Sequence, residues 1–405
     1  MMLFFVMVTG GFFRFVSLNW DDFVRFHPDE RFLTMNVAPK LDMGYLSFTT
    51  HRTDPISVEE QTLYCAEQHP TTSGVGGYFD TRCSDWNPHN VGEGLYVYGT
   101  LPLFLTRVVA ENLNRLGAPG SVWTNYWTDS NGLQLVWRFL SASADMIVIF
   151  IVFLIGTRLH GKWVGLLAAA LYAACVFPIQ QAHFGTADAI TNLFVTLAIY
   201  AAVRVQVDGK LSAYGLFGLA YGMALASRIN VLPVVGLLLI AAGLRMLPAL
   251  LGRVTQEERN RILTYSMGGL VLAGFITVLT FRILNPYAFM GPGFFGLRPN
   301  PAFLDDIATA QNLVSGNAES PPNYQWIGRI DYLFPWQNIV LWGMGIALGL
   351  SGWFGWVWSG WRVLRGKVGS LRNLLLFGWI LVYFGWLGPN WVASMRYFLV
   401  LYPVL

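Results

Sequence analysis

The chain has 405 residues, of which 54% are hydrophobic and only 12% are charged. A water-soluble domain has about a quarter of its residues charged, roughly twice the fraction found here. The mean hydropathy of +0.47 points the same way. The composition therefore excludes a soluble enzyme and predicts an integral membrane protein. The net charge of +3 is small, so its distribution along the chain is more informative than the sum.

Ten apolar runs predict an all-α, polytopic membrane protein, because a helix needs about 20 apolar residues to cross the hydrocarbon core of a bilayer. The runs are 3–18, 138–157, 163–181, 190–205, 212–227, 229–247, 263–283, 336–358, 373–388 and 391–405. The first run has no basic segment before it and no cleavage site after it, so we expect an uncleaved signal anchor. The last run stops at Leu405 and is short for a crossing, so a truncated C-terminus is one alternative and a complete chain the other. We expect one transmembrane domain over 1–405.

An eleventh apolar stretch at 95–112 contains Gly99 and Pro102, and the charge distribution decides how we interpret it. If it lies at the membrane interface, loops 158–162, 204–210, 245–261 and 361–372 all fall on one side. Together these loops hold twelve Lys and Arg against three acidic residues. An excess of basic residues marks the cytoplasmic side. We therefore predict an amphipathic or re-entrant helix at 95–112.

The opposite side is dominated by two long external loops, 19–137 and 284–335. That side holds eleven basic and nineteen acidic residues. Cys65 and Cys83 both lie in the first of these loops, where oxidation is allowed, and a disulfide between them is one alternative and two free thiols the other. Cys175 lies in an apolar run and is predicted to be a small buried hydrophobic residue.

The first group of candidate site residues follows the first span directly, in the sequence Arg-Phe-His-Pro-Asp-Glu-Arg-Phe. It contains His27, the pair Asp29 and Glu30, and Arg31. Pro28 favours a helix start, which would place both carboxylates at a positively polarised N-terminus and keep Asp29 ionised. An ionised and oriented carboxylate is suited to act as a general base. The alternative is an ordinary solvated loop beside a membrane helix.

Two further groups are predicted on the same external side. Asp188 follows the sequence His-Phe-Gly-Thr-Ala, which begins at His183, and the alternative for Asp188 is a simple helix cap. Arg396 enters the last apolar run, and Arg228 lies in a tight turn between two runs. For both arginines the alternative is a side chain that extends to the membrane surface.

The order of these motifs resembles the C-type superfamily of membrane glycosyltransferases, and within it the protein O-mannosyltransferase and lipid A aminoarabinose transferase group. The matching pieces are the Asp29 and Glu30 pair, the segment His183 to Asp188 after Gly165 to Tyr172, the Tyr-Gly-Thr-Leu-Pro-Leu segment from Tyr98, and Arg-Tyr-Phe-Leu-Val-Leu-Tyr-Pro from Arg396. The chain departs from the group in two ways. A lysine common near the phosphate site has no clear counterpart, and Arg31 follows the acidic pair without a gap.

The resemblance implies an inverting glycosyltransferase in the plasma or inner membrane, with its active site outside the cytoplasm. It would move a sugar from a polyprenyl-phosphate donor to a hydroxyl or amine of a protein, lipid or glycan. In this assignment Asp29 is the base, and Glu30 and Asp188 orient the acceptor or hold a divalent cation. Arg396, Arg31 and Arg228 are the candidates for binding the donor phosphate. The lipid bilayer is a partner, and no nucleic acid is expected.

Other interpretations remain open at this stage. A divalent cation is an optional cofactor, with His27, Asp29, Glu30 and His183 as its candidate ligands, although their spacing is not specific for a metal. Loop 284–335, with Gln325 and Trp326, either closes over the sugar or is a passive linker. The rival functions are a lipid or solute transporter, which would place ionisable residues within spans and often shows internal repeats, and a non-catalytic scaffold.

Overall fold

The computed structural model describes residues 1–41, 78–82, 84, 86–117, 125–291, 293–317, 321–367 and 369–405. Cys65 and Cys83 lie outside these ranges, so the predicted disulfide is not tested. The regular secondary structure of the described residues is helical, and β-structure among them is limited to one isolated β-bridge between Phe289 and Pro299. The predicted all-α class is therefore confirmed for these residues.

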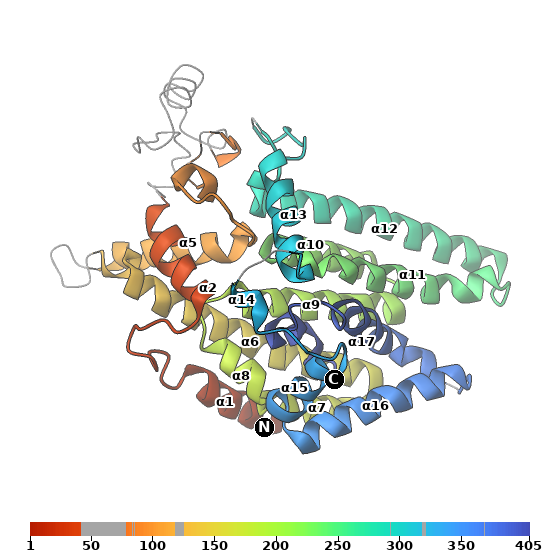
Figure 1. The fold of residues 1–405 in the computed structure, drawn as a ribbon. Coiled ribbons are helices and arrows are strands. Elements are labelled where there is room, and N and C mark those ends of the chain that lie inside the picture. The colour runs from red at the N-terminus through yellow and green to blue at the C-terminus, as the bar shows by residue number, and fades with distance from the viewer. Residues whose placement is uncertain are drawn as a thin grey trace.

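Helices of very different length make up the fold (Figure 1). The α-helices are α1 (Met2–Phe15), α2 (Pro28–Arg31), α5 (Thr100–Leu116), α6 (Ser130–His160), α7 (Lys162–Ala173), α8 (Val176–Ala182), α9 (Ala187–Asp208), α10 (Leu211–Ser227), α11 (Val235–Leu250), α12 (Gln256–Leu284), α13 (Pro301–Ser315), α14 (Pro321–Tyr324), α15 (Leu333–Asn338), α16 (Ile346–Leu364) and α17 (Leu374–Leu387). The π-helices are η1 (Phe32–Val37) and η9 (Ile339–Gly343). The 3-10 helices are η2 (Ala38–Lys40), η5 (Pro88–Val91), η6 (Tyr126–Thr128), η7 (Ile229–Val234), η8 (Pro286–Ala288), η10 (Ser370–Asn373) and η11 (Met395–Leu401).

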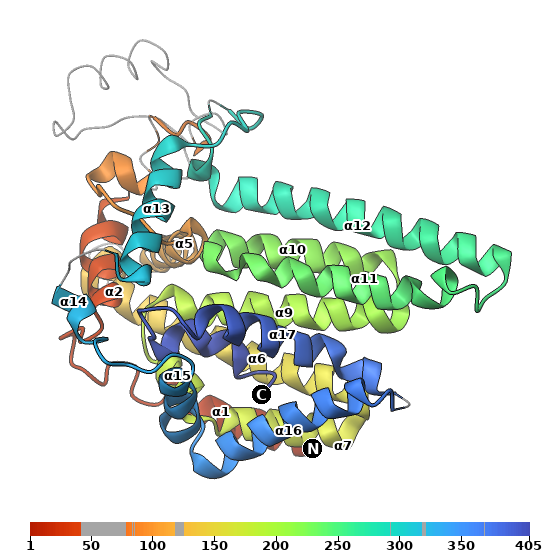
Figure 2. The same cartoon turned by 45° about the vertical axis from the view of Figure 1, so that its right-hand side comes forward.

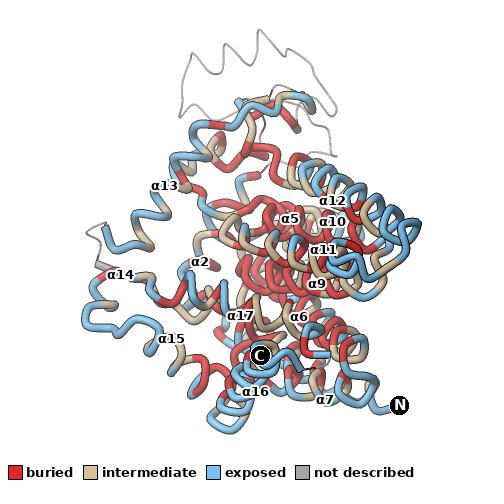
Figure 3. Tube along the Cα trace, turned by 90° about the vertical axis from the view of Figure 1, so that its right-hand side faces the viewer, coloured by how far each residue is buried: buried red, intermediate tan, exposed pale blue. Residues whose placement is uncertain are grey.

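The long helices form a bundle around α9, the most buried of the membrane-length helices. Figure 3 shows buried backbone through α9 and α10, whereas α12 and α16 are largely exposed. The exposed residues of α12 are nevertheless apolar, as Val271 and Phe275 illustrate at 71% and 65% exposure. A long helix with an apolar outer face suits contact with lipid, because lipid tails are themselves apolar. The chain is therefore described as a multi-pass membrane protein.

The predicted number of ten spans is not confirmed. By length and composition, five described helices can cross a membrane, or six if the pair of α7 and α8, bent by 61°, is one broken span. The apolar helices α1 and α10 have 14 and 17 residues and are shorter. The predicted run 336–358 is interrupted between η9 and α16 at Met344 and Gly345, where Gly345 has a φ of 82°.

The segment predicted as the last span is not a membrane-length helix. Its helical part is the seven-residue 3-10 helix η11. Phe398, Leu399, Val400 and Leu401 are buried and belong to the main hydrophobic core. The run is apolar because it packs inside the bundle, and a sequence pattern alone does not separate that environment from lipid.

The two ends of the bundle carry different structures. Figure 2 places α2, α5, α13 and α14 together at the left end, with α5 seen nearly end-on across the bundle axis. The helix predicted at 95–112 is present as α5 and lies across the bundle, and its position at the membrane interface stays a prediction. The basic loops gather at the other end: Arg158 pairs with Asp208, and Gln206 donates a hydrogen bond to the Leu371 carbonyl at 2.8 Å.

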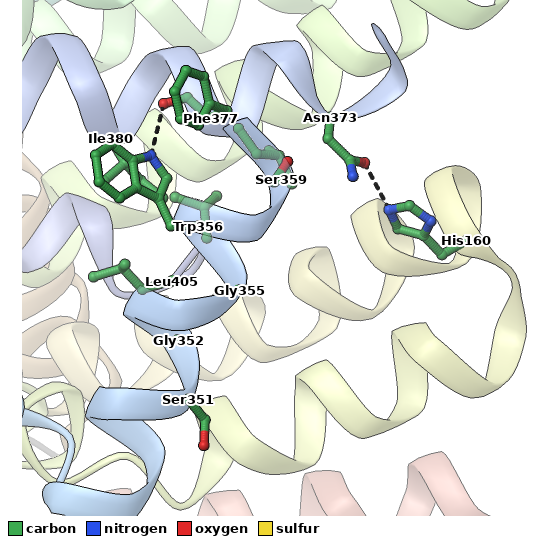
Figure 4. Close-up of a pocket in the computed structure, with 12 residues that line it drawn as sticks. His160, Ser351, Gly352, Gly355, Trp356, Ser359, Asn373, Phe377, Ile380 and Leu405 are labelled. Atoms are coloured by element: carbon green, nitrogen blue, oxygen red, sulfur yellow. Dashed lines mark hydrogen bonds between the residues drawn. The ribbon is translucent and has the colours of Figure 1, made fainter. Parts of the chain in front are cut away.

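A cavity of about 190 Å³ also lies near this basic end, between α16, α17 and the end of α6 (Figure 4). Its polar side is formed by His160, whose ring Nε2 lies 2.8 Å from the Asn373 Oδ1. Small residues such as Gly352 and Gly355 make room for the cavity on α16. None of the predicted site residues lines this cavity.

The grouping of the loops predicts how the protein is oriented. In a background with the native cysteines replaced by serine, we introduce Asp22→Cys at the α2 end and Thr255→Cys at the basic end. An impermeant maleimide should label Asp22→Cys in intact cells and Thr255→Cys only after permeabilisation. External labelling of Thr255→Cys would reverse the orientation.

Candidate active site

Helix α2 begins at Pro28, as the sequence predicted, and it carries the first two acidic residues of the site. The His27 ring Nδ1 accepts the backbone N–H of Asp29 at 3.2 Å and so caps the helix. Asp29 and Glu30 lie in the first turn, and both are buried. Anionic side chains are stabilised at a helix N-terminus, where backbone N–H groups point outward. The chain then continues into the π-helix η1.

Glu30 points away from Asp29 into a fully buried cluster around Arg138 of α6. The Arg138 Nε and Nη2 donate to the two Glu30 carboxylate oxygens, each at 2.7 Å. The Nη1 and Nη2 donate to the two Asp21 oxygens at 2.9 and 2.7 Å, and Nη1 also donates to the Leu18 carbonyl at 2.7 Å. All five N–H groups of the guanidinium are thereby used. We name this the Arg138 cluster (Leu18, Asp21, Glu30 and Arg138).

The Arg138 cluster also holds the second acidic motif in place. The backbone N–H of Gly185 donates to Glu30 Oε1 at 2.6 Å. A Cβ at residue 185 would lie 2.9 Å from that same oxygen, so a larger residue would push it away. Three residues later comes Asp188, in the first turn of α9. The helix cap is Thr186, whose hydroxyl accepts the Asp188 N–H at 3.4 Å, so the Asp188 carboxylate is not the cap.

Two ion pairs form the centre of the site. Arg396 Nη1 pairs with Asp29 Oδ2, and Arg228 Nη1 pairs with Asp188 Oδ1 at 2.6 Å. The ring of Tyr397 lies 5.6 Å from the Arg228 guanidinium and 5.4 Å from that of Arg396. We name these four charged residues the charge quartet (Asp29, Asp188, Arg228 and Arg396). The structure therefore brings together four of the predicted site residues from four separate parts of the chain.

The charges of the quartet act on Asp29. Burial by itself would raise the pKa of this carboxyl, but the nearby positive charges of Arg396 and Arg228 hold it below its usual value. Asp29 is therefore ionised at neutral pH. Burial lowers the pKa of His27, which agrees with a neutral ring whose Nδ1 accepts a hydrogen bond.

One carboxylate oxygen of the quartet stays available. Asp188 is 4% exposed, and its Oδ2 has no hydrogen-bond partner among the described residues. A buried acceptor without a partner is unfavourable, because it has lost its hydrogen bonds to water. The atom is suited to accept a hydrogen bond from a hydroxyl or amine of a bound molecule.

Three predicted site residues lie elsewhere. Arg31 is exposed, and its guanidinium donates to the Arg25 carbonyl at 3.0 and 3.3 Å. Gln325 and Trp326 contact their own loop: the Gln325 carbonyl accepts from Arg329, and the Trp326 ring packs on Phe334.

The four candidate metal ligands do not fit a metal site in this arrangement. Each ligand needs a free lone pair facing a common point. His183 instead has both ring nitrogens on carbonyls, at 2.8 Å from Ile179 and 3.0 Å from Val16. Both Glu30 oxygens bind Arg138, and Asp29 pairs with Arg396. The described residues contain no group of three His, Cys, Asp or Glu side chains that could hold a metal ion.

Sequence reasoning missed Arg138. A signal was present, because Arg138 is a charged residue within the 31-residue apolar helix α6 and such a charge needs a partner. A second buried pair, Arg14 with Asp145 at 2.6 Å, lies between α1 and α6. Arg14 also donates to the Gly10 and Ala173 carbonyls, at 3.1 and 2.9 Å, so this pair ties helices together.

The comparisons with known proteins agree with this fold. Residues 130–281 match the family model described as dolichyl-phosphate-mannose-protein mannosyltransferase. The apo crystal structure of the Archaeoglobus fulgidus oligosaccharyltransferase superposes with a TM-score of 0.56 and 13% identity, over all of this chain and 49% of that one. The same organism's oligosaccharyltransferase AglB, in complex with an inhibitory peptide and a dolichol-phosphate, gives a TM-score of 0.50 and 16% identity, over 76% of this chain and 41% of that one.

The resemblance to C-type membrane glycosyltransferases that the sequence predicted is therefore confirmed by a partial family match and a shared fold. No curated protein matches the chain significantly. The chain spans less than half the length of the two solved structures.

The Arg138 cluster gives a prediction for stability. Arg138→Gln would leave two buried carboxylates without their cation, and breaking a buried pair in this way costs about 3–5 kcal/mol. We expect a markedly lower melting temperature in detergent. Arg158→Gln is the matched control, because its pair with Asp208 is partly exposed and such pairs contribute about 1 kcal/mol or less. Equal melting temperatures for the two variants would contradict the structural role of Arg138.

Proposed function

We propose that the chain is an inverting glycosyltransferase that moves a sugar from a polyprenyl-phosphate donor to an acceptor hydroxyl or amine on the extracytoplasmic side. The observation that carries the proposal is the charge quartet: an ionised carboxylate, Asp29, held against an arginine at one end of a membrane bundle. Nucleotide sugars are not available outside the cytoplasm, so an activated sugar must arrive on a lipid. The family match over 130–281 supports the same reaction class.

In this proposal Asp29 is the general base. The acceptor oxygen or nitrogen attacks the anomeric carbon, the bond from that carbon to the phosphate oxygen breaks, and Asp29 takes the acceptor's proton. Such a base contributes about 10²-fold to 10⁴-fold to the rate. The free Oδ2 of Asp188 would orient the acceptor or a sugar hydroxyl by accepting a hydrogen bond.

Arg396 and Arg228 bind the donor phosphate and stabilise the negative charge that stays on it when the sugar leaves. Charge-assisted hydrogen bonds from arginine to phosphate are among the strong ones. The phosphate would then take the place of Asp29 beside Arg396. When that arginine turns to the phosphate, Asp29 loses the largest charge that lowers its pKa, and it becomes a better base once the donor is bound.

Glu30 and Arg138 do not contact the substrates in this proposal, because their side chains bind one another. Their proposed role is to fix α2 and the start of α9 so that Asp29 and Asp188 face the same space. We also propose that Arg31, Gln325 and Trp326 contact the outer parts of the bound donor or acceptor. We route no step through a metal ion, since the candidate ligands do not fit one.

A panel of polyprenyl-phosphate sugars tests the function. Purified protein in detergent or nanodiscs is incubated with each donor, and donor consumption and free polyprenyl phosphate are followed by mass spectrometry. At least one donor should be consumed. Transport of an intact lipid across proteoliposomes without consumption of any donor would favour the transporter alternative.

The Asp29 and Arg396 variants should differ in kind. Asp29→Asn keeps the size of the side chain and removes its basicity, so turnover should fall at least about 100-fold while donor binding survives. Arg396→Ala should weaken donor binding as well as turnover, because its contact with phosphate is made in the ground state and in the transition state. Turnover is measured by sugar transfer and binding by donor titration.

Asp22→Asn is the matched control for Asp29→Asn, since Asp22 is exposed on the loop that leads into α2. It should transfer sugar at the wild-type rate. If Asp29→Asn folds, binds donor and transfers sugar nearly as fast as wild type, Asp29 is not the base.

The acid limb of the pH profile gives an independent test. Because the pKa of Asp29 lies below its usual value, kcat/KM should hold down to about pH 4 and fall only below it, as Asp29 becomes protonated. Arg396→Gln removes the charge that lowers the pKa of Asp29. The residual activity of this variant should therefore begin to fall at a higher pH than the activity of wild type. Arg298→Gln, at an exposed loop residue, should leave the limb in place. If the acid limb of Arg396→Gln is unchanged, the group that titrates in this limb is not Asp29.

A further inference from the structure

Helix α12 indicates where the hydrocarbon core of the bilayer ends on the α2 side of the bundle. Residues 262–281 carry no charge, and this run has the length of about 20 residues that a crossing needs. Arg282 follows the run in the last turn of the helix. The Leu284 carbonyl accepts a hydrogen bond from the Thr100 hydroxyl of α5 at 2.6 Å. Arg282 therefore lies at the boundary between lipid tails and headgroups, at the end of the bundle that carries α2 and α5 (Figure 2).

The chain beyond α12 folds back onto this last helical turn. The Met290 N–H donates to the Arg298 carbonyl at 2.8 Å, and the isolated β-bridge described above closes the same loop. The Arg282 Nη2 and Nε donate to the Gly293 and Phe294 carbonyls at 2.6 and 3.0 Å. The tip of the loop is thus held beside the last turn of α12, at the level of the membrane boundary.

Two adjacent phenylalanines at this tip have opposite environments. Phe294 packs on the buried ring of Phe79, with 5.3 Å between the ring centres. Phe295 is 87% exposed, and Leu297 is 48% exposed. Exposed apolar side chains that gather on one surface mark a site of contact with a membrane or with another molecule.

Glycines fix the loop in this shape. Gly291 and Gly293 have positive φ values of 63° and 70°, which residues with a side chain rarely adopt. A Cβ at residue 296 would lie 2.5 Å from the Gly291 carbonyl carbon, so the chain also approaches itself closely. The loop therefore has one compact conformation, and this conformation keeps Phe295 outside the bundle.

We propose that this loop inserts into the phospholipid layer at the α2 end of the bundle and anchors the external chain there. We name the inserted part the Phe295 turn (residues 293–298). Phe295 and Leu297 lie among the upper acyl chains, as the apolar residues of interfacial segments do. Arg298, which is also exposed, reaches the lipid phosphates.

Phospholipid is the partner that fits, because the lipid-facing surface of α12 continues up to the turn. Val278 and Ile283, near the end of this helix, are 54% and 40% exposed and apolar. Lipid tails cover such a surface in a membrane-spanning helix. The Phe295 turn extends this surface at the depth where acyl chains meet headgroups. The inference does not depend on the sugar transfer proposed above.

A spin label measures the depth of the turn in the membrane. In the background without native cysteines, Phe295→Cys carries a nitroxide, and the protein is placed in nanodiscs of phosphatidylcholine and phosphatidylglycerol. Collisions of the nitroxide with oxygen, which dissolves in lipid, are compared with collisions with a water-soluble nickel chelate. The label should favour oxygen and lie about 5–10 Å into the boundary between headgroups and acyl chains.

Two further labels calibrate the measurement. Val271→Cys is the lipid control, because the helical rise places residue 271 about 16 Å deeper than Arg282. Asp22→Cys is the water control, since Asp22 is exposed on the loop that leads into α2. The depth at residue 295 should fall between the depths of these two labels.

A label at residue 297 tests whether Phe295 is the anchor. Leu297→Cys keeps the native Phe295, and its label should also favour oxygen. Adding Phe295→Asp should shift this label toward the nickel chelate, because a charged side chain is unfavourable among acyl chains. Adding Phe295→Leu is the matched control and should leave the label in lipid.

A label at residue 295 that behaves like the Asp22→Cys label overturns the proposal. A label that neither reagent reaches also overturns it, because protein would then cover the turn in place of lipid. If Phe295→Asp leaves the label at residue 297 unchanged, Phe295 is not the anchor and the proposal fails. All these measurements are made without a sugar donor, so their outcome is separate from the test of the proposed function.

Discussion

Five hydrogen bonds from one buried guanidinium determine the geometry of the whole site. Arg138 is 0% exposed, and it neutralises Asp21 and Glu30 inside the bundle. A buried charge without partners would be prohibitively unfavourable, so each of these three residues requires the other two. Through Leu18 and Glu30 the cluster fixes the chain after α1 and helix α2, and through Glu30 it fixes Gly185 before α9. The Arg138 cluster thereby fixes the positions of Asp29 and Asp188.

The charge quartet follows a different principle. Its members are paired, but Arg396 and Arg228 retain 22% and 12% side-chain exposure, so they lie where a ligand can reach them. Two carboxylates and two guanidiniums form a neutral group, which tolerates burial in the absence of ligand. An anionic phosphate could replace one carboxylate beside an arginine at small electrostatic cost. In the proposed function, the arginines that pair with Asp29 and Asp188 are therefore the same ones that would bind the donor phosphate.

Much of the site could be predicted from the sequence because its signals are local. Pro28 marks the start of α2, and an excess of Lys and Arg marks the loops that share one end of the bundle. The four residues of the quartet stand at the ends of apolar runs on the predicted external side. Asp29, Asp188 and Arg396 could be grouped from the sequence because they lie on the same predicted side of the membrane and belong to motifs of the same family resemblance.

The rest depends on tertiary contacts that leave no local signal. That Glu30 turns inward, whereas its neighbour Asp29 faces Arg396, is decided by Arg138, more than 100 residues away. The run 391–405 was assigned to lipid because buried and lipid-facing segments have the same composition. Arg31 has the charge to bind phosphate but is held by the Arg25 carbonyl. The backbone hydrogen bond from Gly99 to Ser227 likewise joins residues more than 100 positions apart.

A structure with a bound, non-transferable phosphonate analogue of a polyprenyl-phosphate sugar tests the central claim most directly. The claim predicts that the Arg396 guanidinium leaves Asp29 and binds the phosphonate, while the Arg138 cluster is unchanged. The Asp29 carboxylate should then face the anomeric carbon. A phosphonate bound away from Arg396 and Arg228, with the Asp29 to Arg396 pair intact, would contradict the account.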